Sequence, residues 1–250
     1  MGRAIIVANQ KGGVGKTTTV VNMSAYMADA GNKILVIDLD SQGNSCSGLG
    51  VTKSDDAKGL YEVLLGMVDV KEIIIPTDIK NLYVIPSNIN LSGAQVEMVE
   101  MENREYKLKS IVDKVRNDFD YIFIDSPPSL GLLTINGLVA SDSVIIPIQC
   151  EYYALEGLSQ LLKTINLVKE RLNSKLYIEG VVLTMYDTRT NLSKQVVEEV
   201  IAYFKNKVYK SIIPRNVKLA EAPSFGKPIN IYDPKSVGAV SYYNLSKELT

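Results

Sequence analysis

The segment NQKGGVGKTTT, residues 9–19, carries residue types that hold phosphate groups. It contains three glycines, Gly12, Gly13 and Gly15. Without Cβ atoms, the backbone there is free to turn successive N–H groups toward one anion. Lys16 and Thr17 complete the G-K-[ST] ending of a phosphate-binding loop, in which the lysine reaches the β- and γ-phosphates and the hydroxyl coordinates Mg²⁺. These residues therefore predict a site for a nucleoside triphosphate.

The loop departs from the usual G-x-x-x-x-G-K-[ST] pattern at its start. Gln10 stands where the first glycine is expected, and Lys11 adds a second cation. Lys11 is either a solvated loop charge or a second counter-charge for the phosphates. A plain glycine turn and the dinucleotide pattern G-x-G-x-x-G are the alternatives for the whole loop. The dinucleotide pattern needs glycine where Thr18 stands and holds its pyrophosphate without a lysine, so the triphosphate site is favoured.

Three aspartates follow apolar runs and have the chemistry to handle a metal ion. Asp38 and Asp40 alternate at the end of KILVIDLD, so both are expected on one side of a strand. Asp125 ends a second run, YIFID. Mg²⁺ keeps several waters and takes few direct protein ligands, so Asp125 is expected to hold a Mg²⁺-bound water. The alternative is that these aspartates only cap helices or turns.

Short apolar runs alternate along the chain with longer segments of helical period. Strands are expected over 4–9, 33–40, 82–87, 121–129, 143–149, 177–186 and 208–214. Helices are expected over 16–30, ended by Gly31, and over 92–117, 154–172, 191–205 and 236–248. Strands of Ile and Val without polar alternation are buried on both faces. The pattern predicts a doubly wound α/β fold, with a mostly parallel sheet and helices on both faces, in a single domain over residues 1–250.

In such a sheet, ligands bind beyond the carboxyl ends of the strands. The glycine loop and the three aspartates all follow strands, so the elements are expected to bring them to this edge. Residues 41–60 are polar and rich in glycine, and are expected to cross the same edge.

The composition excludes several kinds of chemistry. Histidine is absent, which excludes a histidine base, a Ser-His-Asp triad and histidine metal ligands. The two cysteines, Cys46 and Cys150, form no C-x-x-C pair and are expected to be small packing residues in a reducing compartment. No stretch approaches 18 apolar residues, and the start lacks a signal-peptide pattern. A cytoplasmic protein that does not engage the membrane is expected.

Longer motifs carry a resemblance to a known family. KGGVGKTTT is the deviant Walker A motif of the ParA/MinD family of P-loop ATPases. The similarity continues through VIDLDSQGNSCSGLG, YIFIDSPPSLGLLTINGL, PIQCEYYALEGLSQL, TMYDTRTNLSKQV and IPRNVKLAEAPSFGKPI, which resemble the chromosomal ParA proteins, also called Soj. It covers essentially the whole chain. One departure is Ser41, where the family usually has proline; the change removes no ligand.

The resemblance implies an ATPase that binds ATP and Mg²⁺. The implied nucleotide contacts are Lys11, Gly12, Gly13, Val14, Gly15, Lys16, Thr17 and Thr18, with Pro214 and Asn216 at the adenine. The implied catalytic residues are Lys11, Lys16 and Asp40, and the implied metal residues are Thr17, Asp38 and Asp125, the two aspartates acting through water. In this family the signature lysine, here Lys11, reaches phosphates bound by the other subunit of a nucleotide-sandwich dimer. Asp40 would position the attacking water.

Basic residues gather in the last part of the chain. Between residues 186 and 235, nine Lys and Arg stand against five Asp and Glu, a local balance of +4 that leaves −5 for the remainder. This asymmetry is either ordinary solvated surface or a footprint for a phosphate backbone. The resemblance favours the footprint, because ParA proteins bind DNA without sequence preference, and Arg189 and Lys218 stand where the family keeps basic contacts. No helix-turn-helix signal appears, so backbone contacts without base readout are expected.

The implied function is an ATP-dependent switch for chromosome or plasmid partitioning. An ATP-bound homodimer would bind non-specific double-stranded DNA at the nucleoid, and a ParB-type centromere-binding protein would stimulate a hydrolysis that is weak without an activator. The main alternative is a MinD-like, membrane-associated positioning ATPase, which needs a basic amphipathic helix that YYNLSKELT does not provide. An iron–sulfur carrier would need clustered cysteines, and nothing marks the substrate pocket of a metabolic ligase. A scaffold without catalysis would not need the intact set Lys16, Thr17, Asp40 and Asp125.

Overall fold

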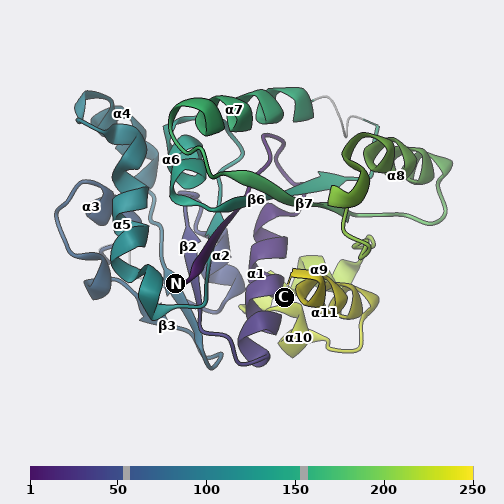
Figure 1. Cartoon of the computed structure of the whole chain (residues 1–250). Helices are drawn as coiled ribbons and strands as arrows, with labels where there is room; N and C mark the ends of the chain where they lie inside the picture. Colours follow the sequence, from purple (N-terminus) through teal and green to yellow (C-terminus); the bar gives the residue numbers. More distant parts are fainter. Residues whose placement is uncertain (53–56, 153–156, 250) are drawn as a thin grey trace.

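The computed structural model describes residues 1–52, 57–152 and 157–249. The strands are β1 (Arg3–Val7), β2 (Ile34–Asp38), β3 (Ile75–Pro76), β4 (Leu82–Ile85), β5 (Tyr121–Asp125), β6 (Ser143–Gln149) and β7 (Tyr177–Thr184). The helices are α1 (Lys16–Asp29), α2 (Asn44–Gly48), α3 (Leu60–Leu64), α4 (Leu91–Glu97), α5 (Lys107–Val115), α6 (Leu132–Ala140), α7 (Leu158–Arg171), α8 (Asn191–Phe204), α9 (Val217–Glu221), α10 (Ile229–Tyr232) and α11 (Val237–Leu249) (Figure 1).

The strands form one mostly parallel sheet in the order β3-β4-β2-β5-β1-β6-β7. All neighbouring pairs are parallel except β3 with β4, which is antiparallel. Asp125 of β5 lies opposite Asp38 of β2 on one side and opposite Val7 of β1 on the other. The glycine loop and two of the predicted aspartates therefore meet at the carboxyl edge of the central strands.

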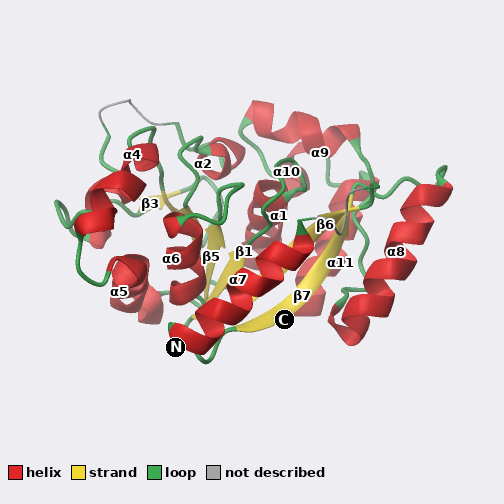
Figure 2. Ribbon diagram, turned by 90° about the horizontal axis from the view of Figure 1, so that it is seen from above, coloured by secondary structure: helices red, strands yellow, loops and turns green. Residues whose placement is uncertain are grey.

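Helices cover both faces of the sheet, as predicted (Figure 2). In β1, Ala4 and Ile6 belong to one buried core, and Ile5 and Val7 belong to the other. The first core is completed by residues of α3 to α8, and the second by residues of α1, α2, α9, α10 and α11. Because successive side chains of a strand point to opposite faces, the unbroken apolar runs follow from the presence of two cores.

Helix α1 begins directly after the glycine loop and ends where the sequence predicts. Gly31 has a φ of 98° and donates its N–H to the carbonyl of Ala28 at 2.9 Å. This left-handed conformation at a helix end favours glycine. The predicted stop is therefore confirmed.

The strand predicted over 208–214 does not form. The segment makes only two isolated bridges, Val181 with Val208 and Tyr186 with Pro214, beside the edge strand β7. Between these bridges, the N–H groups of Lys210 and Ser211 donate to the carboxylate of Glu248 on α11, each at 2.8 Å. Those two N–H groups are thus used by a side chain, which interrupts the ladder.

The helix predicted over 92–117 is two helices, α4 and α5. Between them Asn103 adopts a left-handed conformation with a φ of 53°, which a continuing α-helix does not allow. The helix predicted over 154–172 is α7, from Leu158 to Arg171, and the predicted residues 154–156 lie outside the described part of the chain. The predicted crossing over 41–60 contains the short helix α2, and its residues 53–56 are likewise outside the described part.

Candidate active site

The glycine loop lies between β1 and α1 and is held from two neighbouring strands. The buried side chain of Asn9 donates to the carbonyl of Pro147 on β6 at 2.7 Å and accepts from the N–H of Lys11 at 3.0 Å. On the other side, the hydroxyl of Thr184 on β7 donates to the carbonyl of Val14 at 2.8 Å. Both ends of the loop are thus fixed by hydrogen bonds to the sheet.

The backbone of the loop has the conformation of an anion cradle. Gly13 and Gly15 have φ angles of 74° and 91°, in the left-handed region that favours glycine. Gly15 is the N-cap of α1 and supplies no side-chain cap to the first N–H groups of this 14-residue helix. Uncapped N–H groups and the positive end of the helix dipole favour an anion at this position.

Lys16 is a buried cation at the base of the loop. Lys16 is only 7% exposed, and its Nζ donates to the carbonyl of Lys11 at 3.1 Å. Burial lowers the pKa of Lys16, while the charges of Asp125 and Asp40 act in the opposite direction. A buried ammonium is costly unless it is paired, so this environment is suited to a bound phosphate.

Asp125 ends β5 and is fully buried. Its Oδ2 accepts from the hydroxyls of Thr17 and Ser45, each at 2.7 Å, whereas its Oδ1 has no hydrogen-bond partner among the described residues. Burial raises the pKa of Asp125 to about 6. An unsatisfied carboxylate oxygen beside a phosphate loop fits a donor such as a Mg²⁺-bound water.

Asp38 ends β2 and organises the turn that follows. Its Oδ2 accepts from the N–H groups of Ser45 and Cys46 at 3.0 and 3.1 Å, at the start of α2. Burial, followed by the charge of Asp125, raises the pKa of Asp38 to about 7. A dication bound nearby would favour the ionised form of both aspartates.

The position of Asp40 differs from the prediction that Asp38 and Asp40 lie on the same strand. Strand β2 ends at Asp38, so Asp40 lies in the turn, half-buried, and its Oδ1 accepts from the N–H of Gln42 at 3.1 Å. Within the described residues, no three His, Cys, Asp or Glu side chains gather as a metal-binding group. A metal ion here would therefore take most of its ligands from phosphate oxygens and water.

A cleft of about 360 Å³ lies beside the loop and contains both residues predicted at the adenine. Its walls are largely apolar and are lined by Gly15, Thr18, Thr184, Met185, Ile213, Pro214, Arg215, Asn216, Val217, Leu219, Ala220 and Tyr242. The side chain of Asn216 accepts from the N–H of Leu219 at 3.3 Å and caps α9. A flat apolar base next to a phosphate cradle would fit this arrangement.

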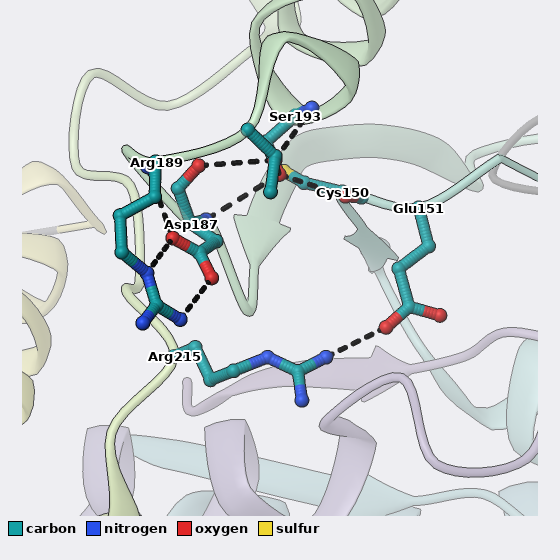
Figure 3. A network of polar contacts seen from close by, with 7 residues as sticks. Cys150, Glu151, Asp187, Arg189, Ser193 and Arg215 are labelled. Atoms are coloured by element: carbon teal, nitrogen blue, oxygen red, sulfur yellow. Dashed lines mark hydrogen bonds and ion pairs between the residues drawn. The ribbon is translucent and has the colours of Figure 1, made fainter.

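The two predicted DNA contacts lie on different elements, and each is held by an acid. Arg189, in the loop before α8, donates through Nε and Nη2 to the two carboxylate oxygens of Asp187 at 2.9 and 2.6 Å (Figure 3). Lys218, on α9, forms an ion pair with Glu221 at 2.9 Å and lies over the ring of Tyr232. Both cations are on the surface, but neither is an isolated charge.

Several residues of the site gave no signal in the sequence. Ser45 bonds to Asp125 from 80 positions away, and Thr184 supports the loop from 170 positions away. Asn9 belongs to the quoted loop segment, but its two hydrogen bonds depend on where β6 lies. Serine, threonine and asparagine are common in turns, so their types alone do not indicate these roles.

The sequence predicts that the two cysteines are packing residues. Cys46 and Cys150 form no disulfide within the described part of the chain and are buried, 5% and 1% exposed, as expected for packing residues. Among the described residues, no helix has both the length and the apolar character needed to cross a membrane.

Known proteins resemble this chain over its full length. A family model described as an AAA domain matches residues 2–178. The sporulation initiation inhibitor protein Soj of Bacillus subtilis is 58% identical over 249 residues, covering 100% of this chain and 98% of that protein. The chromosome partitioning protein ParA of Myxococcus xanthus is 53% identical, covering 100% of this chain and 88% of that protein.

Among solved structures, cobyrinic acid a,c-diamide synthase from Mycobacterium smegmatis with bound ADP and magnesium has a TM-score of 0.88 and 38% identity, covering 100% of this chain and 94% of that one. The Soj and ParA relatives are more similar in sequence to this chain than the synthase is, at 58% and 53% identity. With its P-loop in the expected place and with these full-length relatives, the chain belongs to the ParA/Soj family of chromosome-partitioning ATPases.

Proposed function

We propose that this chain is an ATP-dependent molecular switch, one ATPase domain that binds DNA as an ATP-bound dimer and is released by hydrolysis. The observation that supports the ATP site is the buried Lys16 under an uncapped helix start, beside an Asp125 oxygen that has no hydrogen-bond partner among the residues described. A homologue 38% identical to this chain holds ADP and magnesium, which supports ATP and Mg²⁺ as its ligands.

Each residue of the loop has a role in this proposal. The N–H groups from Gly12 to Thr18 and the ammonium of Lys16 bind the phosphates, and Pro214 and Asn216 border the base. Mg²⁺ would be held by the hydroxyl of Thr17, which is hydrogen-bonded to Asp125. Asp125 and Asp38 would contact the ion through water. Mg²⁺ supplies charge neutralisation on the phosphate oxygens. Asp40 lies in the turn after β2, where it positions the attacking water.

Lys11 completes the site of a second protomer. It is half-buried at the loop, while Lys16 already occupies the base of its own cradle. A cation placed in trans on the γ-phosphate makes dimerisation depend on ATP and stabilises charge in the transition state, as an arginine finger does. We expect hydrolysis to be weak in the isolated protein and to be stimulated by a partner of the ParB type that completes the active site.

The DNA-binding part of the proposal uses Arg189 and Lys218 on duplex phosphates. Dimerisation doubles the number of cations that face the DNA, and each added phosphate contact steepens the salt dependence of binding. In the cell, the ATP-bound form would therefore gather on the nucleoid.

The experiment that tests this function measures binding to non-specific duplex DNA with ATP, with ADP and without nucleotide, at fixed salt. We expect tight DNA binding with ATP but not with ADP or without nucleotide, and loss of that binding in Arg189→Glu. The matched control is Lys169→Glu, which makes the same change of charge on the exposed surface of α7. Equal or absent binding of the wild type in all three states contradicts the function, and binding to anionic vesicles would then be measured instead.

A further inference from the structure

The guanidinium of Arg189 is held by an acid from its own loop. Asp187 accepts two side-chain bonds from Arg189, and its Oδ1 also accepts from the backbone N–H of Arg189 at 3.0 Å. The paired oxygens of a carboxylate match the arginine fork in the way that the oxygens of a phosphate do. Asp187 therefore occupies the edge of Arg189 that would otherwise bind a DNA phosphate.

The two members of the pair differ in exposure. The side chain of Arg189 is 83% exposed, whereas that of Asp187 is 17% exposed. Around Asp187, its N–H faces the hydroxyl of Ser193, and that hydroxyl donates to the carbonyl of Cys150 at 3.1 Å (Figure 3). Asp187 is thus the anchored partner, and Arg189 is the one that is able to move away.

A second arginine lies near Arg189 and is also paired with an acid. Arg189 and Arg215 both line a cleft of about 200 Å³, and Arg215 donates to Glu151 at 2.7 Å (Figure 3). Hydrogen bonds from the side chain and backbone of Arg189, followed by the charges of Arg189 and Arg215, hold the pKa of Asp187 well below its usual range. Asp187 is therefore ionised at neutral pH, and the pair presents no net charge to an approaching phosphate.

We propose that Asp187 is an intramolecular competitor of DNA, a clamp that lowers the DNA affinity of this chain by neutralising Arg189. The inference rests on the proposed function, since it concerns the same DNA-binding surface. A phosphate that binds Arg189 must displace the carboxylate or accept a neutral pair. The clamp keeps non-specific binding weak enough to be reversible.

The test is a double-mutant cycle on binding to a non-specific duplex with ATP, using Asp187→Asn, Arg189→Gln and the double variant. Asparagine keeps an oxygen for the N–H of Arg189 and removes the charge. We expect Asp187→Asn to raise the affinity by up to about 5-fold for each protomer, the upper end of the range for an exposed ion pair. We expect no such gain when Arg189 is already Gln.

The matched control is Glu199→Gln, which removes one negative charge from the exposed surface of α8, close in sequence to the clamp. A gain in Asp187→Asn equal to that of Glu199→Gln, or one that persists in the Arg189→Gln background, overturns the clamp. Asp187→Ser is the second variant if asparagine impairs folding, judged from the melting temperature. Failure of the wild type to bind DNA with ATP overturns the proposed function and the clamp with it, whereas normal wild-type binding without the specific gain overturns the clamp alone.

Discussion

At the scale of single residues, the two lysines of the glycine loop have different environments. Lys16 is buried and tied to the carbonyl of Lys11, whereas the side chain of Lys11 is half-buried and forms no ion pair with another described residue. Lys16 is therefore placed to bind phosphates within its own protomer. Lys11 is placed to act outside it.

This difference predicts separate effects of two alanine variants. Lys16→Ala is expected to lose ATP binding, since the buried counter-charge is removed. Lys11→Ala is expected to bind ATP within a few-fold of wild type, but to lose ATP-dependent dimerisation and about 10³-fold or more of the stimulated hydrolysis rate, as for an arginine finger. Fluorescent-nucleotide titration, light scattering and phosphate release measure the three properties. Equal loss of ATP binding in both variants would show that Lys11 acts in its own protomer.

At the scale of elements, the packing of α11 against α1 forms one wall of the base cleft. Tyr242 of α11 is fully buried, its hydroxyl is 3.2 Å from that of Thr19 on α1, and its side chain lines the cleft. Its neighbour Tyr243 is 44% exposed. The same helix thus offers a buried and an exposed tyrosine at adjacent positions.

Tyr242→Ala is expected to lower the free energy of unfolding by about 3–5 kcal/mol, the cost of removing a buried aromatic side chain. Tyr243→Ala is the control, with an expected cost of about 1 kcal/mol or less, because it loses the edge contact with the ring of Tyr26 and little burial. Urea denaturation measures both. Similar losses in the two variants would mean that α11 is not packed as described.

At the scale of the whole molecule, the phosphate loop, the base cleft and the cleft of Arg189 share residues: Gly15 of the loop lines the base cleft, and Arg215 lines both clefts. The N–H of Arg215 donates to the carbonyl of Tyr186 at 2.9 Å, and Arg215 lines both the base cleft and the cleft of Arg189. Any ligand that binds only the folded chain at these clefts stabilises all the elements that form them.

Mg²⁺ and ATP together are therefore expected to stabilise the fold. At about 100 times the dissociation constant, a ligand adds about 2.7 kcal/mol, which corresponds to about 5–10 °C in the melting temperature of a chain of this size. Chelation of Mg²⁺ should remove most of this shift, and Lys16→Ala should show none. Differential scanning calorimetry measures it, and a shift that is unchanged in Lys16→Ala would place the nucleotide elsewhere.

The sequence by itself determined the mostly parallel sheet with helices on both faces and the residue types that stand at its carboxyl edge. These depend on local patterns: unbroken Ile and Val runs, Gly12 and Gly13 shortly before Gly15-Lys16-Thr17, and aspartates at the ends of runs. Such patterns can be recognised in the sequence because they depend only on residues that are close together along the chain. The edge strand β3 and helix α6 were not predicted, the first being only two residues long.

Only the tertiary structure decided how distant residues use one another's polar groups. Glu248 takes N–H groups 37 and 38 positions away and prevents a strand, and Ser45 reaches Asp125 across 80 positions. The pairing of Arg189 with Asp187 is local in sequence, but the anchoring of Asp187 through Ser193 depends on Cys150, which directly follows β6. Hydrogen bonds form wherever folding brings a donor to an acceptor, and no local pattern encodes that meeting.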